Sequence, residues 1–285
     1  MKYLEHYISR GQYRIYARDY GGEGPAIVLM HGFPDNLHLY DRIIPHLVPS
    51  RRTVTFDFLG WGKSDHPDGY PYTAANQTDD LDAVITQLKL GQVVLVAHDS
   101  SGPPAIDWAL AHPERVASLV LLNTYYCSMP ATRPPEAIIL YSFPIIRNIA
   151  HFFTRIFPKL DRKLFFWQIG RFIRDDVVRK EVVPSLFNDF LVSRPAFLRL
   201  NEDLLHTLRD RRKMIPAMKK FARPVRIIFG DSDPYLNTGV ALSLHELFPT
   251  SELILIPGAR HYVQIDEPEV VARLIVHASE LRSAA

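Results

Sequence analysis

This 285-residue chain contains almost no cysteine and no long apolar run. Cys127 is the only cysteine, so no disulfide can form within the chain, and a reducing compartment suits it. No stretch approaches the roughly 18 apolar residues that a membrane-spanning helix needs. Residues 1–10 mix charged and apolar side chains and lack the continuous apolar core of a signal peptide. We therefore expect a protein of the cytoplasm with no stable membrane span.

Net charge is also small, but it is unevenly distributed. The chain carries a formal charge of +2 at pH 7, and its 47% hydrophobic and 22% charged residues are typical of globular proteins. Residues 124–222 alone contain 18 lysines and arginines against 9 aspartates and glutamates. This imbalance predicts a solvated surface of basic helices; a preference for anionic substrates or for a membrane surface is the alternative. Nucleic acid is not an expected partner.

Predicted strands alternate with helices in both end regions of the chain but not in its middle. Apolar runs rich in β-branched residues end at glycine or polar residues, which is typical of buried parallel strands. Residues 124–222 show helical periodicity and repeated prolines without a convincing strand. We predict an α/β core domain, residues 1–123 and 223–285, interrupted by a helical cap over 124–222. The predicted strands are 3–8 and 12–19 (a hairpin), 26–30, 52–56, one starting at 93, 116–122, 224–230 and 252–256, and the helices are 74–89, 104–111, 238–247 and 268–281.

Three polar residues follow predicted strands, where open α/β sheets place their sites. Asp99 lies at a sharp turn from a strand into a helix, so its side chain is expected to stand above the carboxyl edge of the sheet. Asp233 follows strand 224–230, and His261 follows strand 252–256. The order nucleophile, acid, histidine is that of a catalytic triad on such a sheet.

Longer motifs surround these residues: His31-Gly32-Phe33-Pro34, Phe58 to Asp65, His98-Asp99, His112 to Val116, and Gly258 to His261. Together they resemble the α/β-hydrolase fold family, in its epoxide hydrolase and haloalkane dehalogenase branch. The likeness covers nearly the whole chain. It implies an eight-stranded, mostly parallel sheet with helices on both faces and an inserted helical cap.

The resemblance also implies a role for each member of the triad. Asp99 matches the family's nucleophile, His261 its base and Asp233 its acid, which stands three residues after the glycine. Asp231 is the alternative acid in the same loop. The family's other position for the acid holds Asn123, which is not a carboxylate.

In the reaction implied by this resemblance, Asp99 attacks a saturated carbon and becomes an ester. His261 then takes a proton from water, which attacks the carbonyl carbon of that ester. The backbone N–H groups of Phe33 and Ser100 match the oxyanion hole, and the peptide bond between Phe33 and Pro34 is expected to be cis. A carboxylate attacking an ordinary ester would form an anhydride, so esterase activity is disfavoured.

The chain departs from the family at the residues that hold a leaving group. Ser100 follows the nucleophile where dehalogenases and most epoxide hydrolases of this branch have Trp, and Phe33 stands where dehalogenases have Asn. Ala97 and Ser101 replace the usual glycines of the turn. Because Ser100 and Phe33 replace the residues that bind the halide, haloalkane dehalogenation is less favoured than epoxide hydrolysis.

Epoxide opening needs a proton donor for the ring oxygen, for which the family uses two cap tyrosines. Tyr141 lies about where the first is expected, and Tyr125 and Tyr126 lie at the entrance of the cap. No tyrosine occurs between residues 151 and 230, so the second donor is absent from its usual place. Trp167 is a further candidate for binding substrate, and for each of these aromatic side chains simple packing is the alternative.

The most consistent hypothesis is a cofactor-independent hydrolase that converts an epoxide, in a small apolar electrophilic substrate, to a diol. Haloalkane dehalogenation is the second. Two further alternatives are a serine-type ester hydrolase using Ser100 or Ser101, and a non-catalytic ligand-binding member of the fold. No metal spacing is present, and His31 and His98 are expected to hydrogen-bond to backbone.

Two further questions concern assembly and surface. A monomer or a homodimer is expected. The basic, apolar stretch 138–157 is expected to pack over the pocket, and a helix lying on a membrane surface is the alternative.

Overall fold

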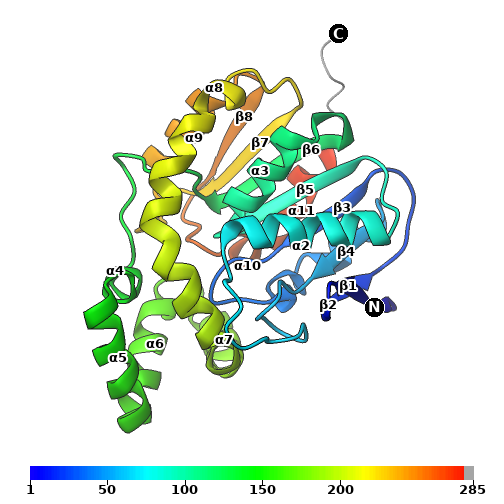
Figure 1. Ribbon diagram of the computed structural model, residues 1–285. Coiled ribbons are helices and arrows are strands. Elements are labelled where there is room, and N and C mark those ends of the chain that lie inside the picture. Colours follow the sequence, from blue (N-terminus) through cyan, green and yellow to red (C-terminus); the bar gives the residue numbers. More distant parts are fainter. Residues whose placement is uncertain (279–285) are drawn as a thin grey trace.

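An eight-stranded sheet forms the centre of the molecule (Figure 1). The computed structural model describes residues 1–278, apart from the side chains of His151 and Asp203. The strand order is β1-β2-β4-β3-β5-β6-β7-β8; β1 with β2 and β2 with β4 pair antiparallel, and all other pairs are parallel. The prediction of a mostly parallel eight-stranded sheet is therefore confirmed. The strands are β1 (Leu4–Arg10), β2 (Tyr13–Asp19), β3 (Ala26–Met30), β4 (Thr53–Phe56), β5 (Val93–Asp99), β6 (Val116–Thr124), β7 (Val225–Gly230) and β8 (Ser251–Ile256).

Helices cover both faces of the sheet, as the sequence predicts (Figure 1). The 3-10 turns are η1 (Leu37–Tyr40), η2 (Pro113–Arg115) and η3 (Arg211–Met214). The α-helices are α1 (Ile44–Leu47), α2 (Ala74–Gln87), α3 (Gly102–Ala111), α4 (Glu136–Ser142), α5 (Pro144–Ile156), α6 (Pro158–Gly170), α7 (Asp176–Asp210), α8 (Ile215–Met218), α9 (Thr238–Leu247), α10 (Val263–Asp266) and α11 (Pro268–Ala278).

Strand β5 shows why the centre of the sheet reads as an unbroken apolar run. Val93, Leu95 and Ala97 point to one face and pack with side chains of α2, α3 and α9. Val94 and Val96 point to the other face, toward α1 and α11. Because both faces are buried, alternation of polar and apolar residues disappears from the strand. The edge strand β1 is covered less completely, since Ile8 alone among its residues is buried, whereas β2 is buried from Ile15 to Asp19.

The region between β6 and β7 contains only helices and loops among the described residues. It corresponds to the insertion predicted over 124–222, and its division from the core as a separate unit stays a prediction. Helices α4, α5 and α6 extend away from the sheet, and α7 runs between them and the core (Figure 1). Helix α7 is 35 residues long and continues through Pro184 and Pro195.

Ion pairs connect α7 and its continuation to neighbouring helices. The guanidinium of Arg194 lies 2.5 Å from Asp161 of α6, and both side chains are buried. Arg211, just after α7, lies 2.6 Å from Asp107 of α3. Removing one partner of the buried pair would leave an uncompensated charge, so the pair fixes the position of α6 against α7.

The differences from the predicted elements are at helix ends and in short pieces. Helices α1 and α10 and turn η1 lack the length for a periodic signal and were not predicted. Helix α2 ends two residues earlier than predicted, and Lys89 has a φ of +50°. Residues 279–281 of the last predicted helix lie outside the described residues.

Gly102 at the start of α3 provides a test of the packing below the strand–helix turn. A methyl group at this position would lie 2.0 Å from Thr124 Oγ1 and 2.7 Å from the carbonyl oxygen of Tyr125. Because the second neighbour is backbone, we expect Gly102→Ala to lower the free energy of unfolding by about 1–3 kcal/mol, more than alanine gains in helix propensity.

Gly91→Ala is the matched control, because a methyl group there has no neighbour within 4 Å. Its free energy of unfolding should stay within about 0.5 kcal/mol of the unmodified protein. Urea unfolding followed by circular dichroism measures both variants. Equal stability of the two alanine variants would contradict the packing described here.

Candidate active site

Asp99 is the last residue of β5 and occupies a sharp turn before α3. Its φ is +49°, a conformation that few residues other than glycine adopt. Its neighbour Gly32 leaves room for it, since a methyl group there would lie 2.5 Å from Asp99 Cβ. The hydroxyl of Thr124 donates to the carbonyl oxygen of Asp99. The turn thus raises the Asp99 side chain at the carboxyl edge of the sheet, where it borders a pocket.

Ser101, which takes the place of a glycine, stabilises this turn from below. Its hydroxyl accepts from the N–H of His98 at 2.9 Å and lies 2.9 Å from the carbonyl oxygen of Met30. The residue is completely buried. Ser101 therefore supports the turn and does not border the pocket, whereas Ser100 does.

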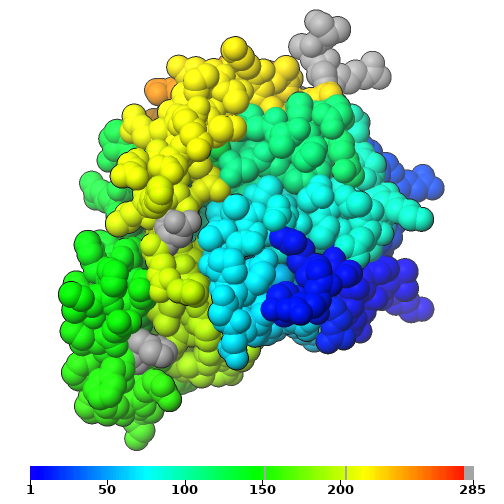
Figure 2. All heavy atoms as spheres, viewed as in Figure 1, coloured from blue at the N-terminus to red at the C-terminus, as the bar shows by residue number. Residues whose placement is uncertain are grey.

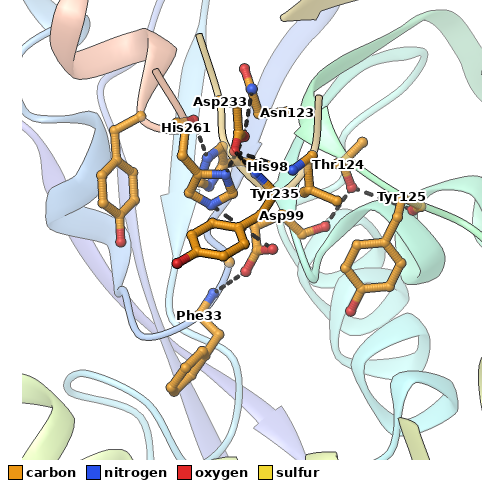
Figure 3. A network of polar contacts seen from close by, with 12 residues as sticks. Phe33, His98, Asp99, Asn123, Thr124, Tyr125, Asp233, Tyr235 and His261 are labelled. Carbon is orange, nitrogen blue, oxygen red and sulfur yellow. Dashed lines mark hydrogen bonds and ion pairs between the residues drawn. The ribbon is translucent and has the colours of Figure 1, made fainter. Parts of the chain in front are cut away.

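His261 lies between two carboxylates. Its Nδ1 is 2.8 Å from Asp233 Oδ2, and its Nε2 is 4.0 Å from Asp99 Oδ1 (Figure 3). Asp233 Oδ1 accepts from the N–H groups of Tyr235 and Leu236, which fixes the carboxylate. The structure therefore brings together the three residues that the sequence nominates for a triad.

Asn123 is an unpredicted support of this arrangement. It is the penultimate residue of β6 and has a φ of +30°, and its Nδ2 donates to Asp233 Oδ2 at 2.8 Å. Its Oδ1 accepts from the N–H of Gly230 at 2.9 Å. Sequence reasoning noted only that Asn123 is no carboxylate, although its position after a strand could have signalled a support for the acid. Asp231 lies on the exposed side of the loop, where its carboxylate accepts from the N–H of Gly258.

Burial and charge act in opposite directions on the histidine. Burial by itself lowers the pKa of His261, but the charges of Asp233 and Asp99 outweigh it and raise the pKa to about 9. The pKa of Asp99 is raised by burial, against the opposing effects of His261 and the N–H groups of Phe33 and Ser100. Burial also acts to raise the pKa of Asp233, but His261 reverses this and leaves it below the ordinary value.

The predicted oxyanion-hole donors lie at the Asp99 carboxylate. The N–H of Phe33 donates to Asp99 Oδ2 at 3.0 Å (Figure 3), and the N–H of Ser100 stabilises the same charge. The peptide bond between Phe33 and Pro34 is cis, as predicted. The Phe33 ring stacks on Phe197 of α7 with 3.6 Å between ring centroids. This contact joins the donor loop to the helices above it.

A second buried group of polar side chains lies behind His261. His98 donates from Nε2 to the carbonyl oxygen of His261 at 3.1 Å, and Tyr262 donates to Asp35 at 2.9 Å. Asp35 Oδ2 lies 4.0 Å from His98 Nδ1, and burial raises the pKa of Asp35 to about 7. Burial lowers the pKa of His98, so its ring is neutral. The predicted backbone hydrogen bond of His98 is confirmed, but Asp35 and Tyr262 were not predicted.

His31 holds the loop next to Gly32 by two backbone hydrogen bonds. Its Nδ1 lies 2.8 Å from the carbonyl oxygen of Gly32, and its Nε2 accepts from the N–H of Phe58 at 3.2 Å. The predicted backbone role of His31 is therefore confirmed. In the part of the chain that the structure describes, no group of three or more His, Cys, Asp or Glu side chains is placed to hold a metal ion.

The pocket above Asp99 has a volume of about 520 Å³ and lies between the sheet edge and the helices α4 to α7. Tyr125, Tyr141 and Trp167 all border it, and their role in binding substrate stays a prediction. Trp167 is half exposed, and the Arg171 guanidinium lies 4.7 Å from its ring centroid. Tyr126 instead faces α3, where its hydroxyl donates to Asp107.

Tyr235 is a further pocket residue that the sequence did not indicate. Its hydroxyl donates to Glu136 at 2.7 Å and accepts from Gln168 at 2.8 Å. These bonds connect the loop of the acid to α4 and α6. The signal available in the sequence was its position two residues after Asp233.

A family model described as the alpha/beta hydrolase fold matches residues 25–268 of the chain. The chain belongs to the alpha/beta hydrolase fold family. The match includes all three residues of the predicted triad and the helices above the pocket. A structure of 2-hydroxy-6-oxo-6-phenylhexa-2,4-dienoate hydrolase from Rhodococcus sp. strain RHA1 shares this hydrolase fold, with a TM-score of 0.79 and 18% identity over 98% of this chain and 99% of that one.

Among curated proteins, this hydrolase is similar to members with different reactions. It is 26% identical to a cis-3-alkyl-4-alkyloxetan-2-one decarboxylase of Shewanella oneidensis, over 97% of this chain and 88% of that protein. It is 29% identical to a haloalkane dehalogenase of Sphingobium indicum, over 92% of this chain and 91% of that protein.

The charges around His261 in this hydrolase can be tested by titration. We expect Asp99→Asn to lower the pKa of His261 below about 9, because the substitution removes one of the charges that raise it. Asp233→Asn should lower this pKa further, since Asp233 makes the larger contribution. Nitrogen-15 NMR of the histidine rings across a pH series measures both shifts.

Asp231→Asn is the matched control, because it removes a carboxylate from the same loop but not from contact with His261. This variant should leave the His261 titration unchanged. A shift in Asp231→Asn as large as that in Asp233→Asn would assign the role of the acid to Asp231.

Proposed function

We propose that this α/β-hydrolase uses Asp99 as a nucleophile toward a saturated carbon of an apolar substrate. Epoxides are the first candidate class of substrate. The observation that carries the proposal is a carboxylate held by an N–H donor and facing a cavity of about 520 Å³, with the His261 imidazole 4.0 Å away. A carboxylate forms an alkyl ester in such an attack and opens the strained ring.

The second step hydrolyses the ester through His261. While Asp99 is ionised, its charge helps to keep His261 protonated. Ester formation removes that charge, so the pKa of His261 falls and the ring becomes available as a base. Asp233 continues to orient the imidazole through Nδ1. The N–H groups of Phe33 and Ser100 stabilise the negative oxygen that forms when water attacks the ester.

Tyr125 is the proposed proton donor for the opened epoxide oxygen. It borders the pocket, and the charge of Asp99 acts on its hydroxyl. Burial raises the pKa of Tyr125, which keeps the hydroxyl protonated. Tyr141 also borders the pocket and lies near the Arg194–Asp161 pair, whose charges affect its pKa. The Tyr235 hydroxyl already donates to Glu136.

A strained lactone is the second candidate substrate. An oxetan-2-one, the ring named for the relative from Shewanella oneidensis, also has a saturated carbon bonded to the ring oxygen. Attack by Asp99 at that carbon would release a carboxylate, which is stable without a proton. Loss of CO₂ with departure of Asp99 would then give an alkene and restore the carboxylate. Ser100 stands after Asp99 where the resemblance implies the indole N–H donor of a tryptophan. Its presence favours the lactone, because the carboxylate that leaves from a lactone needs the least assistance.

Dehalogenation stays a third hypothesis, supported by the relative from Sphingobium indicum. A halide leaving group needs N–H donors on the far side of the attacked carbon. Ser100 provides no indole at the position after Asp99, and Trp167 is half exposed beside Arg171. The hydrolysis of halides is therefore the weakest of the three.

Trapping the ester tests the nucleophile directly. His261→Gln lacks the base, so an epoxide should leave a covalent adduct on Asp99 that persists. Intact-mass spectrometry and peptide mapping of the variant after incubation with a terminal alkyl epoxide, an alkyl bromide or a cis-dialkyl oxetan-2-one give the adduct and its position. Asp99→Asn should form no adduct and lose at least about 10⁴-fold in turnover.

Ser100→Ala in the His261→Gln background is the control for this trap, since it removes the hydroxyl next to Asp99 that borders the pocket. It should keep the adduct on Asp99. An adduct on Ser100, or no adduct together with loss of ester hydrolysis in Ser100→Ala, would contradict an aspartate nucleophile.

The variant Tyr125→Phe tests whether Tyr125 donates a proton to the leaving oxygen. Loss of the hydroxyl should slow the opening of an epoxide by about 10²-fold or more, because general-acid assistance contributes that much. Opening of an oxetan-2-one should change only a few-fold. Single-turnover rates with each substrate measure the difference, and Tyr126→Phe, whose hydroxyl faces α3, is the control. Equal slowing with both rings would contradict the assignment of Tyr125 as the acid.

A further inference from the structure

Helix α5 is oriented with its apolar side outward. Ile145, Ile149, Phe152 and Ile156 recur at helical spacing, and all are exposed; Ile145 is 76% and Phe152 61% exposed. A helix on a globular core normally buries such a stripe. The prediction that stretch 138–157 packs over the pocket is therefore wrong for this stripe of α5.

The polar side of α5 faces the protein instead. The Arg147 side chain is only 11% exposed and lies 2.9 Å from Glu202 of α7. Ala150 and Thr154, one and two turns further along the same side, are half-buried. The inward contacts of α5 thus depend on an ion pair and small side chains, which leaves the apolar stripe without a partner among the described residues.

Exposed apolar side chains continue from α5 across its neighbours, and we call this set the cap face. In Figure 2 the segment that carries it forms the green projection at the lower left. The cap face consists of Phe143, Ile145, Ile146, Ile149, Phe152, Phe153, Ile156, Phe157, Leu160, Leu164 and Trp167.

Positive charge accompanies the cap face. Residues 138–168 contain five basic residues, of which Arg155, Lys159, Arg162 and Lys163 are exposed. The one acidic residue of this stretch, Asp161, is buried against Arg194. A surface of large apolar side chains with a basic border is complementary to a bilayer that contains anionic lipids. A second copy would bring the same cations opposite each other, which disfavours a symmetric dimer through this face.

The cap face is also continuous with the pocket. Phe153, Phe157, Leu160, Leu164 and Trp167 belong to both, since each borders the cavity above Asp99 and is about half exposed. The apolar rim of the pocket therefore opens at the same surface.

We propose that the cap face docks on an anionic lipid bilayer, so that the pocket takes its apolar substrate from the membrane. The bilayer buries the apolar side chains of the α5 stripe, and the cations contact the lipid headgroups. No single helix among the described residues is long and apolar enough to cross a membrane; α4 and α5 together pass that test by length and composition but are bent by 114°. The docking is accordingly peripheral. The uptake of substrate, but not the docking, rests on the function proposed above.

Vesicle flotation of the full chain tests this docking. The protein should float with vesicles of phosphatidylcholine mixed with phosphatidylglycerol, and less with phosphatidylcholine alone or at high salt. The triple variant Ile145→Ser/Ile149→Ser/Phe152→Ser should lower the partition coefficient at least about tenfold. Arg155→Gln/Lys159→Gln/Lys163→Gln should lower it about fivefold per removed cation on the anionic vesicles only.

The matched control removes three exposed apolar side chains of α7, in Val177→Ser/Val192→Ser/Leu205→Ser, and should float like the unmodified protein. None of the three α5 residues borders the pocket, so turnover of a water-soluble substrate by that variant should be unchanged. Asp99→Asn should float normally even if the proposed reaction is wrong.

Three results would overturn the proposal. The first is that the unmodified protein floats with neither vesicle, and the second is that the α5 variant floats as well as the α7 control. A dimer in sedimentation velocity that the α5 variant abolishes, with no flotation, would assign the cap face to a second copy.

Discussion

The arrangement of the site depends on the electrostatic interaction of one imidazole with two carboxylates, of which Asp233 is buried and Asp99 is partly buried. Burying Asp99 and Asp233 without partners would carry a large desolvation cost, so the stability of each charge depends on His261 and on backbone N–H donors. The surrounding features serve this constraint. Asn123 fixes Asp233, His98 fixes the backbone of His261, and Gly32 gives Asp99 the space for its turn.

The charged groups of the site and the side chains that surround the pocket come from different parts of the structure. The three charged groups come from the sheet edge, whereas most of the pocket wall comes from the helices between β6 and β7. Under the proposed function, the same carboxylate and imidazole would open different electrophiles, and the side chains above them would select among these. The proposed reaction, with Ser100 after Asp99, would suit a leaving group that is stable by itself or is assisted by one tyrosine.

Much of the fold was predictable because local sequence and tertiary environment agree in the sheet. β3 and residues 93–97 of β5 are apolar throughout since both faces are buried, and a polar residue follows each of these apolar runs. The site was predictable through strand ends, which meet at one edge whatever lies between them. The supporting roles of Asn123, Asp35 and Tyr235 were not predicted. Each of them has its role only through contacts with residues far away in the chain.

By itself, the sequence determined the parallel sheet, the interruption by helices, and the nomination of Asp99, Asp233 and His261, because these depend on periodicity and on order along the chain. Only the tertiary structure decided which way each helix of the insertion faces. The periodicity of α5 defines an apolar stripe but not its direction, which is set by the pairing of Arg147 with Glu202 of a helix more than fifty residues away. The same reason explains why the pocket wall and its rim could not be predicted: packing between distant segments selects the orientation, and a pattern within one segment does not.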